Sequence, residues 1–142
     1  MISGRKILDM ELKIDIKKLE ELKDRIKKFT QGDKIKLCEA IAKEMAMNLL
    51  RRTKQKTPVQ TGNLRRNWNN SGEKIKNGYQ ETVFNQTEYA AYVEYGHRKP
   101  KSKGWVPGRY MLTKSEKEVG DLYQAIAEKQ VDNAMERLFG GK

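Results

Sequence analysis

Few residues of this chain have the types that catalysis or metal binding requires. The 142 residues include one cysteine, Cys38, and one histidine, His97. Nucleophilic catalysis needs a thiol or hydroxyl beside a base, but Cys38 lies in an apolar helical stripe and His97 in a distant basic segment. A free cysteine in an apolar stripe behaves as a small hydrophobe, so we interpret Cys38 as core packing. One cysteine and one histidine are too few for a Cys/His metal site, and no metal is expected.

Acid-base catalysis and nucleotide binding have equally little support. Residues 58–114 hold only four acidic side chains, and we interpret Glu94 among them as a salt-bridge partner (Glu73, Glu81, Glu88 and Glu94). The sequence contains neither a Walker loop nor the glycine pattern of a dinucleotide-binding fold. We therefore expect no enzymatic activity, no catalytic residue and no cofactor. A small nuclease or hydrolase is the weakest of the functions considered.

The charge of the chain is strongly positive and unevenly distributed. Thirty Lys and Arg residues against nineteen Asp and Glu residues give a net charge of +11. Such a charge favours DNA, an acidic protein surface or an acidic membrane as a neighbour, and charge alone does not choose among them. Residues 115–142 are the one acidic segment, with four basic and six acidic side chains. In an assembly of identical subunits, this segment could face a neighbour's basic loop, packing the subunits head to tail.

Residues 96–109 form the segment with the most functional content, a long basic loop. Cations interleaved with an aromatic side chain suit contact with a phosphate backbone and occasional base stacking. The alternative is a solvated hairpin tip whose tryptophan folds back onto the body of the protein. The candidate contacts to DNA, or to another partner of the loop, are Arg98, Lys99, Lys101, Lys103, Trp105 and Arg109.

A second set of candidates suits contact between subunits. Arg65 and Arg66 follow a turn, and we expect their guanidinium groups to clamp a carboxylate on an adjacent subunit rather than to be simple surface cations. Tyr92 and Glu94 are two residues apart. On a strand they would share one face, where a neighbour could contact them.

The elements that must position these residues follow from periodicity. Alternation from Leu8 to Ile16 predicts a half-buried strand, and apolar residues at threes and fours then predict a short amphipathic helix to Phe29, capped by Asp15. A core helix is expected over 33–57, ending before Pro58. Residues 80–85 and 89–95 are expected to be strands. Ser115 and Glu118 predict a capping box at the start of a final helix over 115–139.

These elements predict one α+β domain over residues 1–142. A small antiparallel β-sheet packs against two long α-helices and one shorter helix, with the long basic loop outside. The expected parts are an N-terminal strand and short helix (1–32), the core helix (33–57), the sheet with its loop (58–114) and the C-terminal helix (115–139). No apolar run approaches the roughly 20 residues that span a bilayer, so no membrane contact is expected.

Three segments together resemble a known family. They are residues 57–66 (TPVQTGNLRR), 89–97 (YAAYVEYGH) and 108–112 (GRYML). Their order and spacing over roughly residues 33–139 are similar to those of the small tail-component or neck proteins of tailed bacteriophages. The segment GWVPGR within the loop most resembles members from contractile-tailed phages and phage-tail-like elements.

The resemblance implies a structural virion protein of the head-tail junction, a neck or tail-completion subunit without enzymatic activity. It implies a homo-oligomeric ring, six- or twelve-fold, around the DNA channel. It also implies contacts with connector or head-closure proteins and with tail-terminator or tail-tube proteins. The protein would be made in the cytoplasm of the bacterial host and would end in the virion. The alternative from another class is a free, sequence-independent DNA-binding protein that uses the basic loop 96–109.

Overall fold

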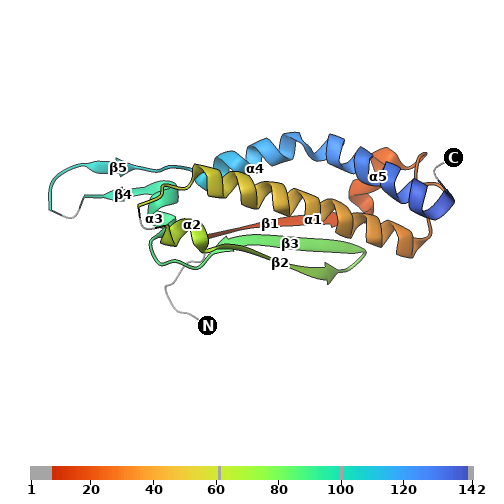
Figure 1. Ribbon diagram of the computed structural model, residues 1–142, viewed down its shortest axis with the longest axis horizontal. Coiled ribbons are helices and arrows are strands. Elements are labelled where there is room, and N and C mark those ends of the chain that lie inside the picture. Colours follow the sequence, from red (N-terminus) through yellow and green to blue (C-terminus); the bar gives the residue numbers. More distant parts are fainter. Residues whose placement is uncertain (1–7, 61, 100, 141–142) are drawn as a thin grey trace.

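The computed structural model describes residues 8–60, 62–99 and 101–140 (Figure 1). The first seven residues of the expected N-terminal part therefore lie outside the described residues. The elements in chain order are β1 (Leu8–Asp15), the 3₁₀ helix η1 (Ile16–Leu22), α1 (Gln31–Lys56), α2 (Asn63–Arg66), β2 (Trp68–Ile75), β3 (Gly78–Asn85), α3 (Ala90–Tyr95), β4 (Gly96–Arg98), β5 (Trp105–Pro107), α4 (Met111–Asp121) and α5 (Tyr123–Phe139).

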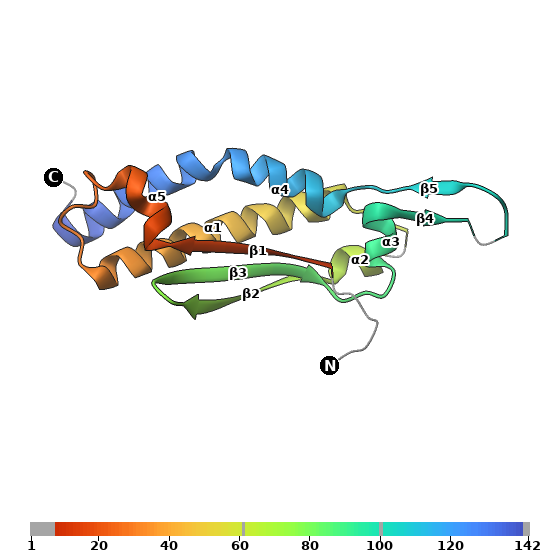
Figure 2. The ribbon, with the colours of Figure 1, turned by 180° about the vertical axis from the view of Figure 1, so that it is seen from behind.

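The main sheet is antiparallel, with strand order β1-β3-β2. Leu8 and Ile14 of β1 are buried while Asp9, Glu11 and Lys13 are exposed, which confirms the strand expected from their alternation. Helix α1 crosses one face of this sheet, and α4 and α5 run along the other side of α1 (Figures 1 and 2). The fold is α+β, as the sequence predicts.

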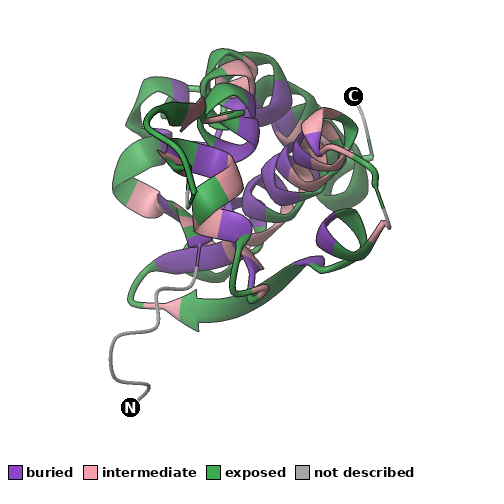
Figure 3. Ribbon diagram, turned by 90° about the vertical axis from the view of Figure 1, so that its left-hand side faces the viewer, coloured by how far each residue is buried: buried purple, intermediate pink, exposed green. Residues whose placement is uncertain are grey.

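Helix α1 carries the centre of the core. Thr30 caps it, and Asp33 bonds back to the Thr30 amide at 3.0 Å in a capping box. Its apolar stripe is buried between the sheet and the C-terminal helices (Figure 3), and two fully buried alanines, Ala42 and Ala46, allow close approach. The helix ends at Lys56, two residues before Pro58, close to the expected boundary.

Residues 89–95 are a helix rather than the expected strand. The pattern Tyr89, Ala91, Val93, Tyr95 alternates as in a strand, but the two buried residues of α3 are Ala90 and Glu94, four apart on one helical face. Two consecutive alanines also favour helical backbone. The four-residue spacing of the buried side chains, which is helical, is therefore a better guide to this segment than the two-residue alternation of its apolar residues.

The segment after β1 is a tighter helix than predicted. Asp15 accepts a hydrogen bond from the Lys18 amide at 2.9 Å, so the predicted N-cap is confirmed. The helix is 3₁₀ and stops at Leu22, where turns continue to Lys28. Leu19 and Leu22 are its buried residues, and their spacing of three matches three residues per turn.

Two further boundaries differ from the sequence-based expectation. The C-terminal helix starts at Met111 and breaks at Leu122 into α4 and α5. The predicted capping box is wrong, because Ser115 is buried inside α4 and Glu118 bonds to Arg52 instead. Residues 68–75 form β2, a strand that the sequence analysis did not expect, because eight cross-strand pairs with β3 override the low strand propensity of Asn, Ser and Gly.

Candidate macromolecular interface

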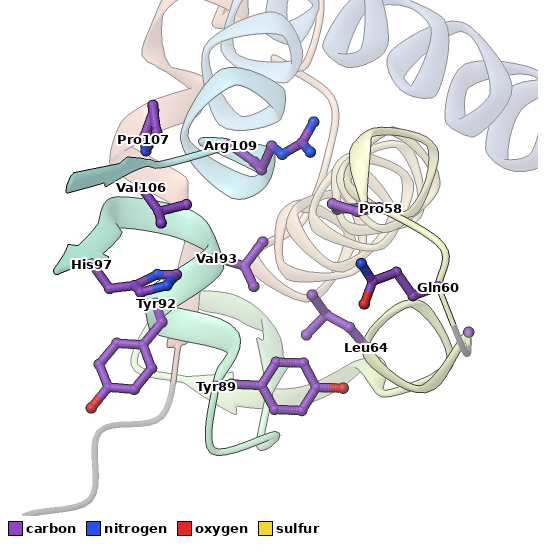
Figure 4. Close-up of a pocket in the computed structure, with 11 residues that line it drawn as sticks. Pro58, Gln60, Leu64, Tyr89, Tyr92, Val93, His97, Val106, Pro107 and Arg109 are labelled. Carbon is purple, nitrogen blue, oxygen red and sulfur yellow. The ribbon is translucent and has the colours of Figure 1, made fainter. Parts of the chain in front are cut away.

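The three segments that carry the family resemblance meet at one end of the molecule. There they surround a hollow of about 450 Å³ (Figure 4). The turn after α1, helix α3 and strand β5 each supply side chains to it. The lining residues are Pro58, Gln60, Gly62, Leu64, Tyr89, Tyr92, Val93, His97, Val106, Pro107 and Arg109.

The turn after α1 is fastened to the sheet by buried hydrogen bonds. The Thr57 hydroxyl donates to the Thr53 carbonyl at 2.7 Å and accepts from the Trp68 indole at 2.9 Å. The Asn85 side chain donates to the Leu64 carbonyl at 2.9 Å. Gly62 has a φ of 81°, which favours glycine over other residues at this reversal. These bonds hold both ends of the turn, at Thr57 and Leu64, beside the hollow.

Helix α3 is joined to the start of α4 through Glu94. The Glu94 carboxylate is fully buried and accepts from the Leu112 amide (2.9 Å), the Thr113 amide (2.8 Å) and the Thr113 hydroxyl (2.6 Å). A carboxylate at a helix N-terminus satisfies free amides and interacts favourably with the helix dipole. Two main-chain bonds, from Arg109 to Val93 and from Tyr110 to Glu94, close the same junction.

This arrangement corrects two expectations about Glu94. Tyr92 and Glu94 lie on opposite faces of a helix, because Tyr92 is 62% exposed and Glu94 is 0% exposed. Glu94 also bonds to backbone amides and a hydroxyl rather than to a cation. We therefore keep Tyr92 as a candidate for contact with a neighbour and assign Glu94 to the stability of the chain.

The basic loop is a β-hairpin that projects beyond the body of the protein (Figures 1 and 2). Strands β4 and β5 pair antiparallel, and the Lys99 amide donates to the Gly104 carbonyl at 3.1 Å. Its cations Arg98, Lys99, Lys101 and Lys103 are all exposed. Trp105 is 58% exposed, and its indole nitrogen lies close to Gly96 at the base of the hairpin, so the ring leans toward the base while much of it stays in solvent. The basic hairpin thus presents four cations and an indole to a partner.

The predicted arginine clamp is partly engaged within the chain. The Arg65 side chain donates through Nε to the Lys54 carbonyl at 3.0 Å, in the last turn of α1. Arg66 lies against Gly62, where a methyl group would be 2.6 Å from its guanidinium. Both residues are exposed at the same end of the molecule as the basic hairpin. Their contact with a neighbouring subunit remains a prediction.

Positive charge and exposed aromatic rings coincide at this end. Residues 51–66 and 96–109 contain eleven Lys and Arg residues and no Asp or Glu. Two of these cations, Arg52 and Lys56, bond to Glu118 of α4 at 3.0 and 2.7 Å, which lowers the pKa of that carboxyl. Most of the large exposed apolar side chains also belong to this end: Val59, Tyr89, Tyr92, Tyr95, Trp105 and Tyr110.

Exposed tyrosine, tryptophan and arginine side chains around a hollow are typical of protein-protein interfaces. The sequence pointed to Tyr92 and Trp105 but not to Tyr89, Tyr95 or Tyr110. The available signal was the number of tyrosines in the resembling segments.

The acidic C-terminal segment bonds to its own chain at several points. Asp132 pairs with Arg25, and Glu118 pairs with the two α1 cations described above. Those bonds join α5 and α4 to neighbouring elements of the same subunit. Whether the segment also faces a neighbour's basic hairpin stays a prediction.

The residues that sequence analysis considered for chemistry are poorly placed for it. Burial, with a smaller effect from Asp15, raises the pKa of the Cys38 thiol to about 12, so the thiolate form is disfavoured. His97 lies at the hollow, its ring centroid 5.8 Å from that of Tyr92. Among the described residues there is no group of three or more His, Cys, Asp or Glu side chains that could hold a metal ion. Within the same residues, no helix combines the length and the hydropathy needed to cross a bilayer.

An end of the molecule that offers cations, exposed tyrosines and a hollow suits contact with other macromolecules. Residues 20–96 match the HK97-gp10-like family, described as a bacteriophage tail-component family. The match covers more than half of the chain, and the chain belongs to this family. It is thus related to structural components of phage tails, which are parts of the virion. Searches of curated proteins and of solved structures found no match.

Proposed function

We propose that the protein is a neck or tail-completion subunit of the phage head-tail junction, without enzymatic activity. In this proposal, identical subunits form a ring around the DNA channel, between the connector and the tail. The observation that carries the proposal is the basic end, where two segments rich in Lys and Arg, 51–66 and 96–109, both contribute to the tyrosine-lined hollow. Both features serve contacts with other macromolecules, and family membership supports the tail as their location.

The two features have different roles in the proposal. The basic hairpin, with Arg98, Lys99, Lys101 and Lys103, lies toward DNA, because several such hairpins in a ring would surround the duplex with positive potential. Phosphate contacts of this kind are independent of base sequence. Arg65, Arg66 and Tyr92 contact neighbouring proteins of the junction, which include other copies, connector or head-closure proteins and tail-terminator or tail-tube proteins.

The projecting hairpin also favours a second candidate, a free DNA-binding protein. Salt dependence separates the two functions. A free DNA-binding protein binds duplex DNA as the isolated chain and loses affinity steeply with salt, whereas a ring subunit binds weakly by itself. Tight duplex binding by the isolated protein, lost when the four hairpin cations become serine, would favour the second candidate.

Particle incorporation tests the proposed function through the cations of the turn. Arg65→Glu with Arg66→Glu is expected to leave the circular dichroism spectrum close to wild type but to remove the chain from purified particles. Lys27→Glu with Lys28→Glu, two exposed cations in the turn after η1 and away from the basic end, is the matched control and is expected to be incorporated normally. If the arginine variant unfolds, these residues serve the fold, and their proposed role in assembly is wrong.

A further inference from the structure

Both edges of the three-stranded sheet are available for pairing in the described part of the chain. Strands β1 and β2 are the edges. The Ile16 amide donates to the Asn77 carbonyl. Ile16 and Asn77 thus continue the β1-β3 register by one pair, and this pair is a hydrogen-bonded one. Hydrogen-bonded pairs alternate along an antiparallel ladder. Because of this alternation, the backbone N–H and C=O groups that point away from β3 belong to the odd-numbered residues of β1 and to the even-numbered residues of β2.

Strand β2 is an unusual edge. Trp68 at the start of β2 is buried, but residues 69–74 are exposed, including the even-numbered ones on the helix-facing side, so α1 leaves this part of the strand uncovered. Asn, Ser and Gly are poor strand formers, yet β2 pairs with β3 over eight residues without a bulge or proline. Natural proteins protect edges with bulges, prolines or charges, and of these β2 has only the charged Glu73 and Lys74, so its outward backbone groups can still pair with a further strand.

The two edges fit one another across a rotational axis. Both strands run antiparallel to β3 and hence parallel to each other. They also share partners on β3: Gln80 faces Lys13 on one side and Glu73 on the other. If rotation about an axis along the strands generates the next subunit, the β1 of that subunit lies parallel to the β2 of the first. Each β2 residue then lies beside the β1 residue whose number is lower by 60, as Glu73 beside Lys13.

That register satisfies the backbone. In a parallel ladder a residue bonds to the two residues that flank its opposite number. Gly72, whose groups point outward, would lie opposite Leu12 and bond to the outward groups of Glu11 and Lys13. Even residues on β2 and odd residues on β1 are the combination that this geometry requires.

The same register satisfies the side chains of the outer sheet face. Glu73 meets Lys13, and no like charges are opposed. The Asn69 amide meets the Asp9 carboxylate, and the Ser71 hydroxyl meets the Glu11 carboxylate, so each acid meets a donor. All six side chains are exposed in the single chain. Opposite charges and hydrogen-bonding pairs across strands are each favourable.

We propose that β2 of one subunit pairs in parallel with β1 of a second copy, with Glu73 beside Lys13, so that the sheets of adjacent subunits become continuous. This interface is heterologous, and repeated around an axis it closes into a ring. The inference rests on the proposed ring and names the surface that forms it.

Cysteine cross-linking within particles tests the pairing. In one chain positions 13 and 73 are separated by β3, about 10 Å apart, beyond the roughly 7 Å that a disulfide spans. Lys13→Cys with Glu73→Cys is therefore expected to give a ladder of covalent multimers after mild oxidation of purified particles. Lys13→Cys with Asn69→Cys, about 13 Å out of register, is the matched control and is expected to remain monomeric on the gel.

A charge exchange covers the case in which the cysteines hinder assembly. Lys13→Glu alone is expected to lower the content of the chain in particles several-fold, and adding Glu73→Lys to restore it. If the double-cysteine variant enters particles but forms no cross-links, the pairing is wrong while the proposed function stands. The same holds if Glu73→Lys does not restore incorporation of the Lys13→Glu variant. Absence of the wild-type chain from particles would overturn the proposed function and the pairing with it.

Discussion

Glu94 provides the sharpest test of how the basic end is held together. Its buried carboxylate accepts three hydrogen bonds, from the amides of Leu112 and Thr113 and from the Thr113 hydroxyl. Glu94→Gln keeps the size of the side chain but replaces one acceptor oxygen by an NH₂ donor. That donor must face at least one amide N–H, which then loses its partner in a buried site.

The expected loss of stability follows from these contacts. Hydrogen bonds to a charged group contribute about 1.5–3 kcal/mol each and neutral ones about 0.5–1.5 kcal/mol. Weakening two bonds and leaving one buried donor unpaired should therefore cost about 3 kcal/mol. For a domain of this size, such a loss lowers the melting temperature by about 6–12 °C.

The assay is urea unfolding of the isolated chain followed by circular dichroism. The Glu94→Gln variant is expected to have a lower midpoint and an unchanged m-value. Glu116→Gln, on the exposed side of α4, is the control and should remain within about 0.5 kcal/mol of wild type. If Glu94→Gln were equally stable as wild type and yet failed to enter particles, Glu94 would act on a partner, and the capping role would be refuted.

Three further predictions concern other parts of the molecule. Because burial raises the pKa of Cys38 to about 12, a thiol reagent at about pH 8 should label it only after unfolding, and labelling of the folded chain at the rate of free cysteine would contradict its buried position. Lys56 and Arg52 lower the pKa of Glu118, so their contribution is present above its ordinary pKa and lost as the pH falls through the lowered value. The difference in urea midpoint between wild type and Glu118→Gln should thus shrink from neutral pH toward about pH 3, whereas a constant difference would argue against the ion pairs. Serine at the four cations of the basic hairpin should reduce the salt slope of duplex binding by up to about 3.6, and an unchanged slope would place the phosphate contacts elsewhere.

The sequence was informative where one residue pattern had one structural solution. The alternation in β1, the Asp15 cap and the core helix before Pro58 all follow from local rules, and the structure confirms them. Local rules failed where tertiary contacts decide. Strand β2 exists because β3 pairs with it, which the Asn, Ser and Gly residues of β2 do not indicate.

The candidate site was only partly predictable for the same reason. The cations of the basic hairpin could be located from composition alone, and they are exposed as expected. The role of Glu94 as a cap of α4 could not be predicted, because its partners Leu112 and Thr113 are eighteen and nineteen residues away along the chain. The tyrosine-lined hollow likewise depends on three segments that meet only in the fold.

The proposed function makes this chain a structural part of the head-tail junction. Immunogold labelling of particles from the producing cells, combined with mass spectrometry of the same particles, tests it most directly. We expect label at the top of the tail and a few copies of the chain per particle. Finished particles that lack the chain would contradict the claim and would leave an assembly factor or a free DNA-binding protein.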